Sequence, residues 1–498
     1  MECILSVDLG GSSLRAGLVD RAGGITHRAV VQASAPIPVD GVAEVEPGLW
    51  WEALAEAVER LEGDAGAALD AVEAVAITGF TRTQVFLDAA GQALRPAPTW
   101  QDTRAADSLA AIEHLLPTDH PERAALNPFH PVARLEWLRR SEPETLSRLA
   151  VIVEPKDYLN LRLTGVVTSD PISSARLVAA AEPGRGRQSI LDALGLPRGV
   201  VPPLRDPGTA LGRVRAGLPG AFRRLQGRPV MTMANDTWTA VVGLGAMRDG
   251  YAYNLSGTTE VFGTVARRHA RAEGLLDVAW GEGLHQLGGP SLCGGDTLVW
   301  LVDLLGRSGW ASREIGADLD LLLSGPRDPQ ALLFLPFLQG ERTPFWDVTR
   351  RGAFIGLNRR HGPSDCAMAV LEGIALLNRV VLERAEAALD RKVSQIRFGG
   401  GGAASATWSQ IKADVTGCQV AVTECEETGL LGGALVAWTA LGAFASLSQA
   451  QEELVRIARL HEPDLAKAAR YERMFTLFCD AERALRPISA ALAETAQA

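Results

Sequence analysis

Residues Ser6 to Asp20 (SVDLGGSSLRAGLVD) combine an acid, two glycines and two hydroxyls in a spacing that suits phosphate binding. An apolar strand leads to Asp8, the turn continues through Ser12 and Ser13, and strand-like residues resume at Leu14. Glycine lets backbone N–H groups approach an anion closely, and a carboxylate at Asp8 can hold the metal ion that accompanies a phosphate. The alternative is that this segment is only a tight hairpin.

A second segment of the same kind occurs at Tyr253 to Val265 (YNLSGTTEVFGTV), where Gly257, Thr258 and Thr259 separate two strand-like runs. One such hairpin opens each half of the chain. Two related domains that share one polyphosphate would produce this pattern, as in actin-like ATPases. The pair of hairpins therefore favours a nucleotide-binding protein of two similar domains.

Asp236 is the candidate acid for proton transfer. A strand from Val230 to Met233 runs into Asn235 and Asp236, and a helix is predicted to begin at this acid. An acid at a strand-to-helix switch can take a proton from an acceptor hydroxyl. The alternative is a helix N-cap, a role that Asp fills well. Its position just before the second hairpin favours the chemical role.

Candidates for an acceptor pocket follow the strand that ends at Gly79. Thr81, Arg82 and Gln84 come directly after it, and ligands of open α/β sheets bind at the carboxyl ends of strands. Arg82 is equally compatible with a surface position.

Trp100, Asp102 and Arg104 follow a further strand end and form a second acceptor candidate. An aromatic face, a carboxylate and a guanidinium together commonly hold sugars. The alternative is a capping Asp with a surface Arg. Asn127 and Phe129 lie in the next loop, which either closes over a substrate or only connects two elements.

Two glycine-rich turns in the second half precede predicted helices. Gly294 and Gly295 introduce one helix, and four glycines at 399–402 introduce another that Ser405 can cap. A glycine turn at a helix N-terminus suits a nucleotide. No lysine lies near either turn, which disfavours P-loop and protein-kinase chemistry. The later run ETGLLGGALVAWTALGAF predicts a small-residue helix that packs closely.

Length and composition bound the class of protein. A chain of 498 residues favours two large domains, which we place at 1–247 and 248–498. The net charge of −10 argues against general nucleic-acid binding, and only four residues are lysines. Six cysteines without a C-x-x-C pair indicate reduced thiols. No run of 18 uncharged apolar residues occurs, so we expect a cytoplasmic protein that does not enter a membrane.

The assembled segments resemble the FGGY family of carbohydrate kinases over nearly the whole chain. The most specific pieces are SVDLGGSSLRAGLVD, PFLQGERTPFWDVTRRGAFIGL and GGGAASATWSQIKADVTG with the following GLLGGALVAW. The resemblance implies an α/β fold of two actin-like (ribonuclease H-like) ATPase domains with a cleft between them. It also implies ATP with Mg²⁺ as donor, a sugar or polyol hydroxyl as acceptor, and Asp236 as the general base. Among family members, the stretch PVARLEWLRRSEPETLSRLAVIVEPKDYLNLRLTG most resembles xylulose kinases, so a pentulose such as xylulose is the expected acceptor.

The resemblance also implies roles for individual positions. Asp8 and Asp236 would lie beside the magnesium. The first phosphate turn would use Gly11, Ser12 and Ser13, and the second Gly257 and Thr258. The remaining positions line the nucleotide (Gly295, Gly401, Gly402 and Ser405) or the acceptor (Thr81, Arg82, Trp100, Asp102 and Asp236).

Three stretches depart from the pattern of xylulose kinases. Gly79-Phe80-Thr81-Arg82-Thr83 stands where G-Q-M-H-G is usual, and this change falls on the acceptor pocket. Met233-Ala234-Asn235-Asp236 replaces the usual G-G-D. Glu260 follows Gly257-Thr258-Thr259, where a small residue is usual.

Other functions stay open at this point. The acceptor alternatives are another ketose, a polyol such as glycerol, or a sugar acid. A different class of protein is a non-catalytic actin-like module that uses ATP for assembly, although it would have no use for a polar acceptor pocket. A homodimer is compatible with either function.

Overall fold

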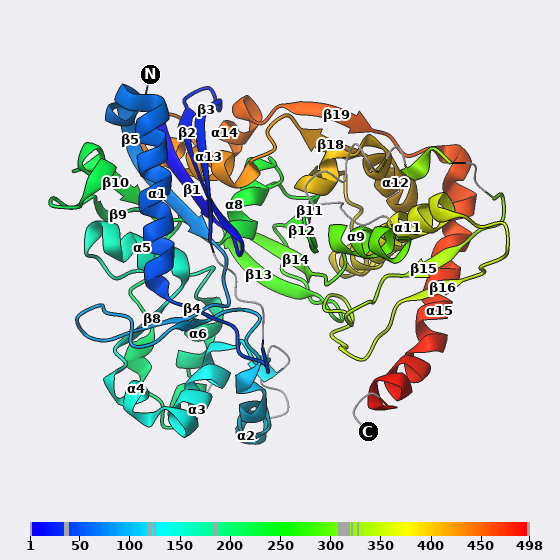
Figure 1. Cartoon of the computed structure of the whole chain (residues 1–498), viewed down its shortest axis with the longest axis horizontal. Coiled ribbons are helices and arrows are strands. Elements are labelled where there is room, and N and C mark those ends of the chain that lie inside the picture. Colours follow the sequence, from blue (N-terminus) through cyan, green and yellow to red (C-terminus); the bar gives the residue numbers. More distant parts are fainter. Residues whose placement is uncertain are drawn as a thin grey trace. The chain divides into compact units, whose positions relative to one another are not determined.

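The computed structural model describes residues 2–33, 39–116, 122–123, 126–183, 188–306, 319, 322–325 and 328–495. The chain folds into two compact units. Unit 1 comprises Met1–Gly243 and Gly429–Leu454, and unit 2 comprises Leu244–Thr428 and Val455–Ala498. Each unit is an α/β structure around its own mixed sheet (Figure 1). The predicted domains, 1–247 and 248–498, place Gly429–Leu454 in the second domain, whereas these residues belong to unit 1.

Six strands form the sheet of unit 1, in the order β3 (Ile25–Gln32), β2 (Ser13–Asp20), β1 (Cys3–Leu9), β5 (Val72–Gly79), β10 (Pro229–Met231) and β9 (Ala210–Arg213). Strands β1, β2 and β3 form two antiparallel hairpins. Strand β5 is parallel to β1, β10 is parallel to β5, and β9 is antiparallel to β10. The carboxyl ends of β1, β5 and β10 therefore lie at one edge of the sheet.

Helix α1 (Pro47–Ala65) packs on β2 and β3 of this sheet. Trp50, Leu54, Val58 and Leu61 recur at helical spacing and are buried, which makes α1 amphipathic. The other helices of unit 1 are α2 (Leu109–Leu115), α3 (Pro131–Ser141), α4 (Pro143–Arg148), α5 (Pro155–Thr164), α6 (Ala175–Ala181), α7 (Ile190–Ala193), α8 (Asp236–Gly243), α13 (Thr428–Ala440) and α14 (Leu447–Leu454). Short 3₁₀ turns lie at η1 (Gly66–Ala71), η2 (Arg104–Ser108), η4 (Arg198–Val200) and η5 (Gly220–Leu225).

Two small antiparallel sheets support the loops of unit 1. One joins β4 (Glu44–Val45) to β7 (Ala97–Pro98), and the other joins β6 (Val85–Leu87) to β8 (Val151–Val153). A separate apolar cluster forms between α2, α3, α6 and α7, which gives this loop-rich region a core of its own.

Helix α13 reaches the main sheet of unit 1 through its glycines. A Cβ atom at Gly432 would lie 1.8 Å from the carbonyl oxygen of Thr239, and one at Gly433 would lie 2.5 Å from Ser6 Oγ. Since real side chains do not approach so closely, only glycine allows α13 to pack against β1 and α8 at this distance. The predicted close-packing helix is confirmed, and its packing explains why Gly429–Leu454 belongs to unit 1.

Seven strands form the sheet of unit 2, in the order β13 (Leu276–Gly281), β14 (Leu284–Pro290), β12 (Glu260–Ala266), β11 (Tyr251–Ser256), β17 (Gln395–Gly399), β18 (Val420–Thr423) and β19 (Ile457–His461). From β14 to β19 the pairings are antiparallel, antiparallel, parallel, parallel and antiparallel. Unit 1 has the same sequence of pairings from β3 to β9. The two units therefore share one order of strand pairings, which agrees with the prediction of two related domains.

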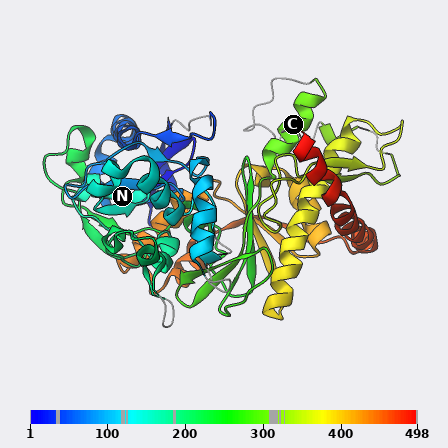
Figure 2. The same cartoon turned by 90° about the horizontal axis from the view of Figure 1, so that it is seen from below.

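The long helix α11 (Pro363–Leu389), yellow in Figure 2, packs over β12 and β14 and alongside α12 (Ala406–Thr416). Unit 2 also contains α9 (Gly295–Leu304), α15 (Ala468–Thr495), the 3₁₀ turns η6 (Gly401–Ala404) and η7 (Leu465–Lys467), and the hairpin of β15 (Leu333–Leu335) with β16 (Ala353–Ile355). In the described part of the chain, no helix combines the length and the apolar character that a bilayer crossing needs.

Candidate active site

Three strand ends of unit 1 are joined directly to one another. Phe80 N donates to the carbonyl oxygen of Leu9 at 3.1 Å, and Thr78 Oγ1 donates to that of Ala234 at 2.9 Å. A parallel bridge also links Gly79 to Asn235. These bonds bring the segments that carry Asp8, Arg82 and Asp236 to one edge of the sheet.

The first glycine turn is closed by a hydrogen bond from Gly10 N to the carbonyl oxygen of Ser13 at 2.9 Å. Gly11 and Ser12 are exposed, whereas Ser13 is buried as the first residue of β2. A Cβ atom at Gly11 would lie 3.7 Å from Trp100 Nε1, so this turn and the predicted aromatic acceptor residue are neighbours.

Asp8 is half-buried beside the first turn of α13. A Cβ atom at Gly429 would come within 2.5 Å of Asp8 Oδ2, so the glycine leaves this carboxylate its space. The helix N-terminus carries a partial positive charge that favours a nearby carboxylate. The contact between the first strand and a helix more than 400 residues later could not be read from the hairpin alone.

Asn235, rather than Asp236, makes the side-chain cap at the start of α8. Asn235 Oδ1 accepts from Trp238 N at 2.9 Å, whereas the Asp236 carboxylate accepts from its neighbour Thr237, at 2.6 Å from N and 3.3 Å from Oγ1. Burial raises the pKa of the Asp236 carboxyl, and the bonds from Thr237 and the charge of Arg82 offset part of this rise. The capping alternative for Asp236 therefore loses its support.

Arg82 occupies a left-handed backbone conformation with φ of 62°, which is uncommon for a residue other than glycine. Its guanidinium lies 5.3 Å from the ring centre of Phe129, and its charge acts on Asp236. Arg82 is half-buried, and the same is true of Thr81. The surface alternative for Arg82 does not fit these contacts.

Arg134 of α3 ties the two acceptor loops together, and the sequence did not mark it. It is 2% exposed and donates to the carbonyl oxygen of Arg82 at 2.9 Å, to Gln84 Oε1 and to the carbonyl oxygen of Thr99. Burial lowers the pKa of Arg134 to about 9, which still leaves it charged at neutral pH. Its only sequence signal is a cation within the apolar face of PVARLEWL.

Asp102 and Arg104 hold the loop in which they lie. Asp102 is 3% exposed and accepts from Ala43 N at 3.0 Å and from Arg104 Nη2 at 2.7 Å. Arg104 also pairs with Glu44 and stacks 4.7 Å from the ring centre of Trp137. A direct contact of Asp102 with an acceptor stays a prediction.

Two glycine turns of unit 2, at Gly294–Gly295 and at Gly400, converge on the segment from Ser256 to Thr259. Gly295 N donates to the carbonyl oxygen of Gly257 at 2.9 Å. A Cβ atom at Gly294 would lie 2.6 Å from the carbonyl oxygen of Thr258. A Cβ atom at Gly400 would lie 2.4 Å from the carbonyl oxygen of Ser256. Backbone therefore packs on backbone here, while Gly257 and Thr258 themselves stay exposed.

Ser405 caps α12, as predicted, because its hydroxyl accepts from Trp408 N at 3.1 Å. Gly401 is exposed, whereas Gly402 is buried against Ser256 and the ring of Trp408. Contacts of Gly401, Gly402 and Ser405 with a nucleotide stay predictions.

Glu341, from the motif GERTP, fixes the segment that leads into α9. Its carboxylate accepts from Ser291 Oγ at 3.0 Å, Leu292 N at 2.8 Å and Cys293 Sγ at 2.9 Å. In the same region Asp296 N donates to the carbonyl oxygen of Thr258, and burial raises the pKa of the Asp296 carboxyl to about 6. The sequence analysis assigned no role to either acid, because both make contacts with segments that are distant in the sequence.

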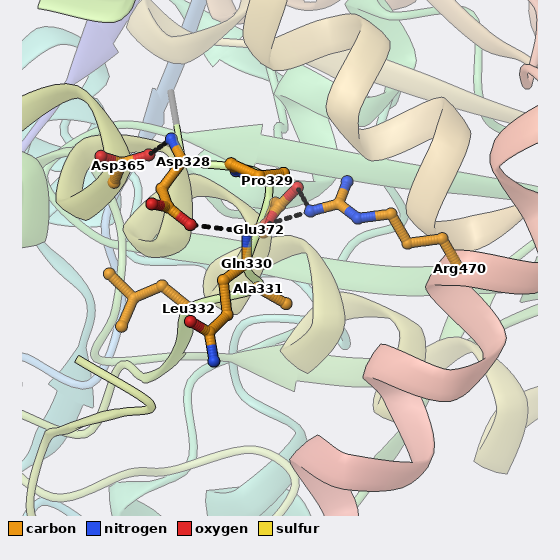
Figure 3. Close-up of a pocket in the computed structure, with 8 residues that line it drawn as sticks. All are labelled: Asp328, Pro329, Gln330, Ala331, Leu332, Asp365, Glu372 and Arg470. Carbon is orange, nitrogen blue, oxygen red and sulfur yellow. Dashed lines mark hydrogen bonds and ion pairs between the residues drawn. The ribbon is translucent and has the colours of Figure 1, made fainter. Parts of the chain in front are cut away.

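A pocket of 320 Å³ elsewhere in unit 2 has carboxylates in its wall but none of the predicted site residues (Figure 3). Its acids are paired: Asp328 with Arg360, Glu372 with Arg470, and Asp365 with the backbone N–H of Gly362. Among the described residues no group of three or more His, Cys, Asp or Glu side chains is arranged to hold a metal. The predicted site residues lie instead at the strand ends of unit 1 and in the turns of unit 2.

Family models match both halves of the chain: the N-terminal domain of the FGGY family of carbohydrate kinases matches residues 3–243, and its C-terminal domain matches residues 252–441. The chain belongs to the FGGY family of carbohydrate kinases. As a family member it is a phosphotransferase with the two-domain actin-like fold.

Curated relatives cover nearly the full length. A xylulose kinase of Escherichia coli K12 is 28% identical, with 98% of this chain and 100% of the relative covered. A xylulose kinase of Lactococcus lactis subsp. lactis is 26% identical, with 99% of each chain covered. A glycerol kinase of Cereibacter sphaeroides is 31% identical, with 95% and 98% covered.

Solved structures agree with this family. The crystal structure named as a xyloylose kinase from Brucella ovis has a TM-score of 0.84 at 27% identity and covers 99% of this chain and 100% of its own. A glycerol kinase of Plasmodium falciparum with ADP also gives 0.84, with 97% and 98% covered, but at 18% identity it supports the fold alone.

Proposed function

We propose that this FGGY kinase transfers the γ-phosphoryl group of ATP to a hydroxyl of a small sugar, with a pentulose such as xylulose as the leading acceptor. The observation that carries the proposal is the state of Asp236, whose capping role is taken by Asn235 and whose carboxyl has a raised pKa beside Arg82. Xylulose kinases are prominent among its full-length relatives.

In this proposal Asp236 accepts the proton of the acceptor hydroxyl. The freed oxygen forms the new bond to the γ-phosphorus as the bond from that phosphorus to the departing ADP oxygen breaks. A raised pKa makes a carboxylate a better base, provided that it stays deprotonated at the working pH. The half-buried position keeps Asp236 partly accessible to a substrate.

ATP and Mg²⁺, when bound, supply the phosphoryl group and the cation that spreads its charge. The exposed turn at Gly257 and Thr258 offers backbone N–H groups without bulky side chains, which fits a phosphate. Gly295, Gly401 and Gly402 are the further nucleotide contacts that we propose in unit 2. In unit 1, Gly11 and Ser12 suit a phosphate and Asp8 suits the cation.

A sugar acid is the second candidate acceptor, and Arg82 favours it. A guanidinium offers a planar fork of donors that matches a carboxylate, and this one is oriented by Phe129 and by its unusual backbone conformation. A neutral ketose would instead place two neighbouring hydroxyls against Arg82.

The test is ADP formation by the purified chain with MgATP and a panel of ketoses, polyols and sugar acids. The proposal predicts stimulation by a pentulose. Stimulation only by acids of similar length would select the second candidate, and ADP formation that no acceptor stimulates would favour an ATP-binding module.

A further inference from the structure

Glu260, Asn378 and Lys412 form a buried cluster in unit 2, which we call the buried triad; Asn254 Nδ2 also donates to Glu260 Oε2 at 3.3 Å. Lys412 Nζ lies 2.9 and 3.1 Å from the two carboxylate oxygens of Glu260 and donates to Asn378 Oδ1 at 2.7 Å. Asn378 Nδ2 donates back to Glu260 Oε2 at 3.0 Å. The three residues are 0%, 2% and 1% exposed, so the ion pair is removed from water.

The surroundings of Lys412 are apolar. Its ammonium lies 5.0 Å from the ring centre of Phe398 and 5.1 Å from that of Trp408. Burial lowers the pKa of Lys412, and the charge of Glu260 offsets part of this change. A buried ion pair is weak evidence for stability, because well-packed apolar residues often serve stability as well or better. We therefore attribute the triad to the positioning of neighbouring backbone segments rather than to a gain in stability.

The backbone of Glu260 is bonded to the segment that leads into the turn at Gly294 and Gly295. Its N–H donates to the carbonyl oxygen of Cys293 at 3.0 Å, and its own carbonyl oxygen accepts from Ser291 N at 2.8 Å. Glu260 follows directly on the exposed turn of Gly257, Thr258 and Thr259. Its side chain thus anchors the residue at which that turn enters β12.

The other two members come from the helices behind the turns. Lys412 lies on α12, whose N-terminus is capped by Ser405 and preceded by the glycine turn that packs on Ser256. Asn378 lies on α11. The triad therefore links the start of β12, where the exposed turn ends, to the helix that follows the glycine turn.

We propose that Glu260 and Lys412 are positioning residues for the nucleotide: their ion pair fixes the turn at Gly257 and Thr258 relative to the turn at Gly400 to Gly402. This inference rests on the proposed function, since it takes ATP as the ligand of both turns. It also gives a role to the acid at position 260, which departs from the family pattern.

The experiment measures ADP binding by calorimetry, without acceptor, together with the KM values for ATP and acceptor and with Tm. Glu260→Gln and Lys412→Met should each raise the dissociation constant for ADP and the KM for ATP by about tenfold or more, since small displacements of binding groups weaken binding steeply. The KM for the acceptor should stay within about twofold, because the acceptor candidates lie in unit 1.

Asp414→Asn is the matched control. Asp414 lies on the same helix, is also buried, and pairs with Lys467 at 2.7 Å rather than with β12. This variant should lower Tm and leave ADP affinity within about twofold of the wild type. Equal losses of ADP affinity in Asp414→Asn and Lys412→Met would overturn the proposal.

The triple variant with Glu260→Leu, Lys412→Met and a third apolar replacement separates positioning from stability. Asn378 would lose both partners in this background, so the variant also carries Asn378→Leu. Three apolar side chains should restore Tm toward the wild-type value, whereas ADP affinity should stay low because the link between the turns is lost. Recovery of both together would overturn the inference, and so would unchanged ADP affinity in all three variants. A wild type that binds no ADP would instead overturn the proposed function itself.

Discussion

The two units repeat one order of strand pairings, yet the ends of their strands carry different chemistry. In unit 1 the edge holds half-buried ionisable side chains, Asp8, Arg82 and Asp236. In unit 2 the corresponding hairpin ends in an exposed glycine turn, and its charged pair, Glu260 and Lys412, is buried behind it. The hairpin of unit 1 also ends in an exposed glycine turn. We propose that the ionisable side chains for the reaction belong to unit 1 alone, whereas unit 2 offers its ligand backbone groups.

This contrast follows from which groups can approach a ligand. Glycine turns allow N–H groups to contact phosphates without side-chain hindrance, so unit 2 suits a nucleotide. A proton transfer needs an ionisable group with a tuned pKa, and the pair of Asp236 and Arg82 in unit 1 provides one. Four predictions probe this division, beginning with the largest effect.

Asp236→Asn should lower kcat by roughly 10² to 10⁴, the range for loss of a general base, and leave ADP affinity unchanged. Turnover under saturating ATP and calorimetry with ADP measure the two quantities. Asn235→Ala is the control: it removes the cap of α8, should cost about 1 kcal/mol of stability, and should keep kcat within several-fold. A larger loss of kcat in Asn235→Ala than in Asp236→Asn would reverse the assignment.

Arg82→Ala should lower kcat/KM for the acceptor about tenfold to over a hundredfold, since a charge-assisted hydrogen bond is worth about 1.5 to 3 kcal/mol. The KM for ATP should not change. Arg162→Ala is a matched control, because Arg162 also stacks on an aromatic ring of unit 1, 4.9 Å from the centre of Trp51. If both variants affect the acceptor equally, Arg82 has no special place in the pocket.

Gly400→Ala should weaken ADP binding by about tenfold or more. The new Cβ would lie 2.4 Å from the carbonyl oxygen of Ser256, at a φ of +85° that costs a side chain about 1 kcal/mol or more. Gly417→Ala has a similar φ of +69° with no atom within 4 Å of the Cβ, so it carries the strain without the clash. Equal ADP affinity in the two variants would show that backbone packing at the turns is unimportant.

The smallest effect concerns pH. Asp236 must be deprotonated to accept a proton, so activity should fall as the pH drops through its raised pKa. The charge of Arg82 lowers this pKa, and Arg82→Gln should therefore shift the acid limb of kcat/KM to higher pH. An unshifted limb in the residual activity would mean that Arg82 does not act on the base.

The sequence predicted the elements that its local patterns encode. The two hairpins, the Ser405 cap and the close-packing glycine helix are all confirmed. Each depends on residues that are neighbours in the chain. The family and its fold also followed from motifs that stay contiguous.

Contacts between distant segments escaped prediction. Arg134 looked like an ordinary helix residue, yet it holds the loops of Arg82 and Thr99 from 52 and 35 positions away. Glu341 fixes a segment about 50 residues earlier. The return of α13 to unit 1 depends on the shape of its glycine face against Thr239, which no local pattern specifies.

The most direct measurement of the central claim is the ratio of phosphorylated acceptor to ADP, determined by mass spectrometry in one reaction for the wild type and for Asp236→Asn. The wild type should form about one phosphorylated sugar for each ADP, and Asp236→Asn should form both roughly 10² to 10⁴ times more slowly. ADP that accumulates in the wild type without a phosphorylated acceptor would contradict a kinase and leave an ATPase. Equal product in both proteins would contradict the role of Asp236 as the base.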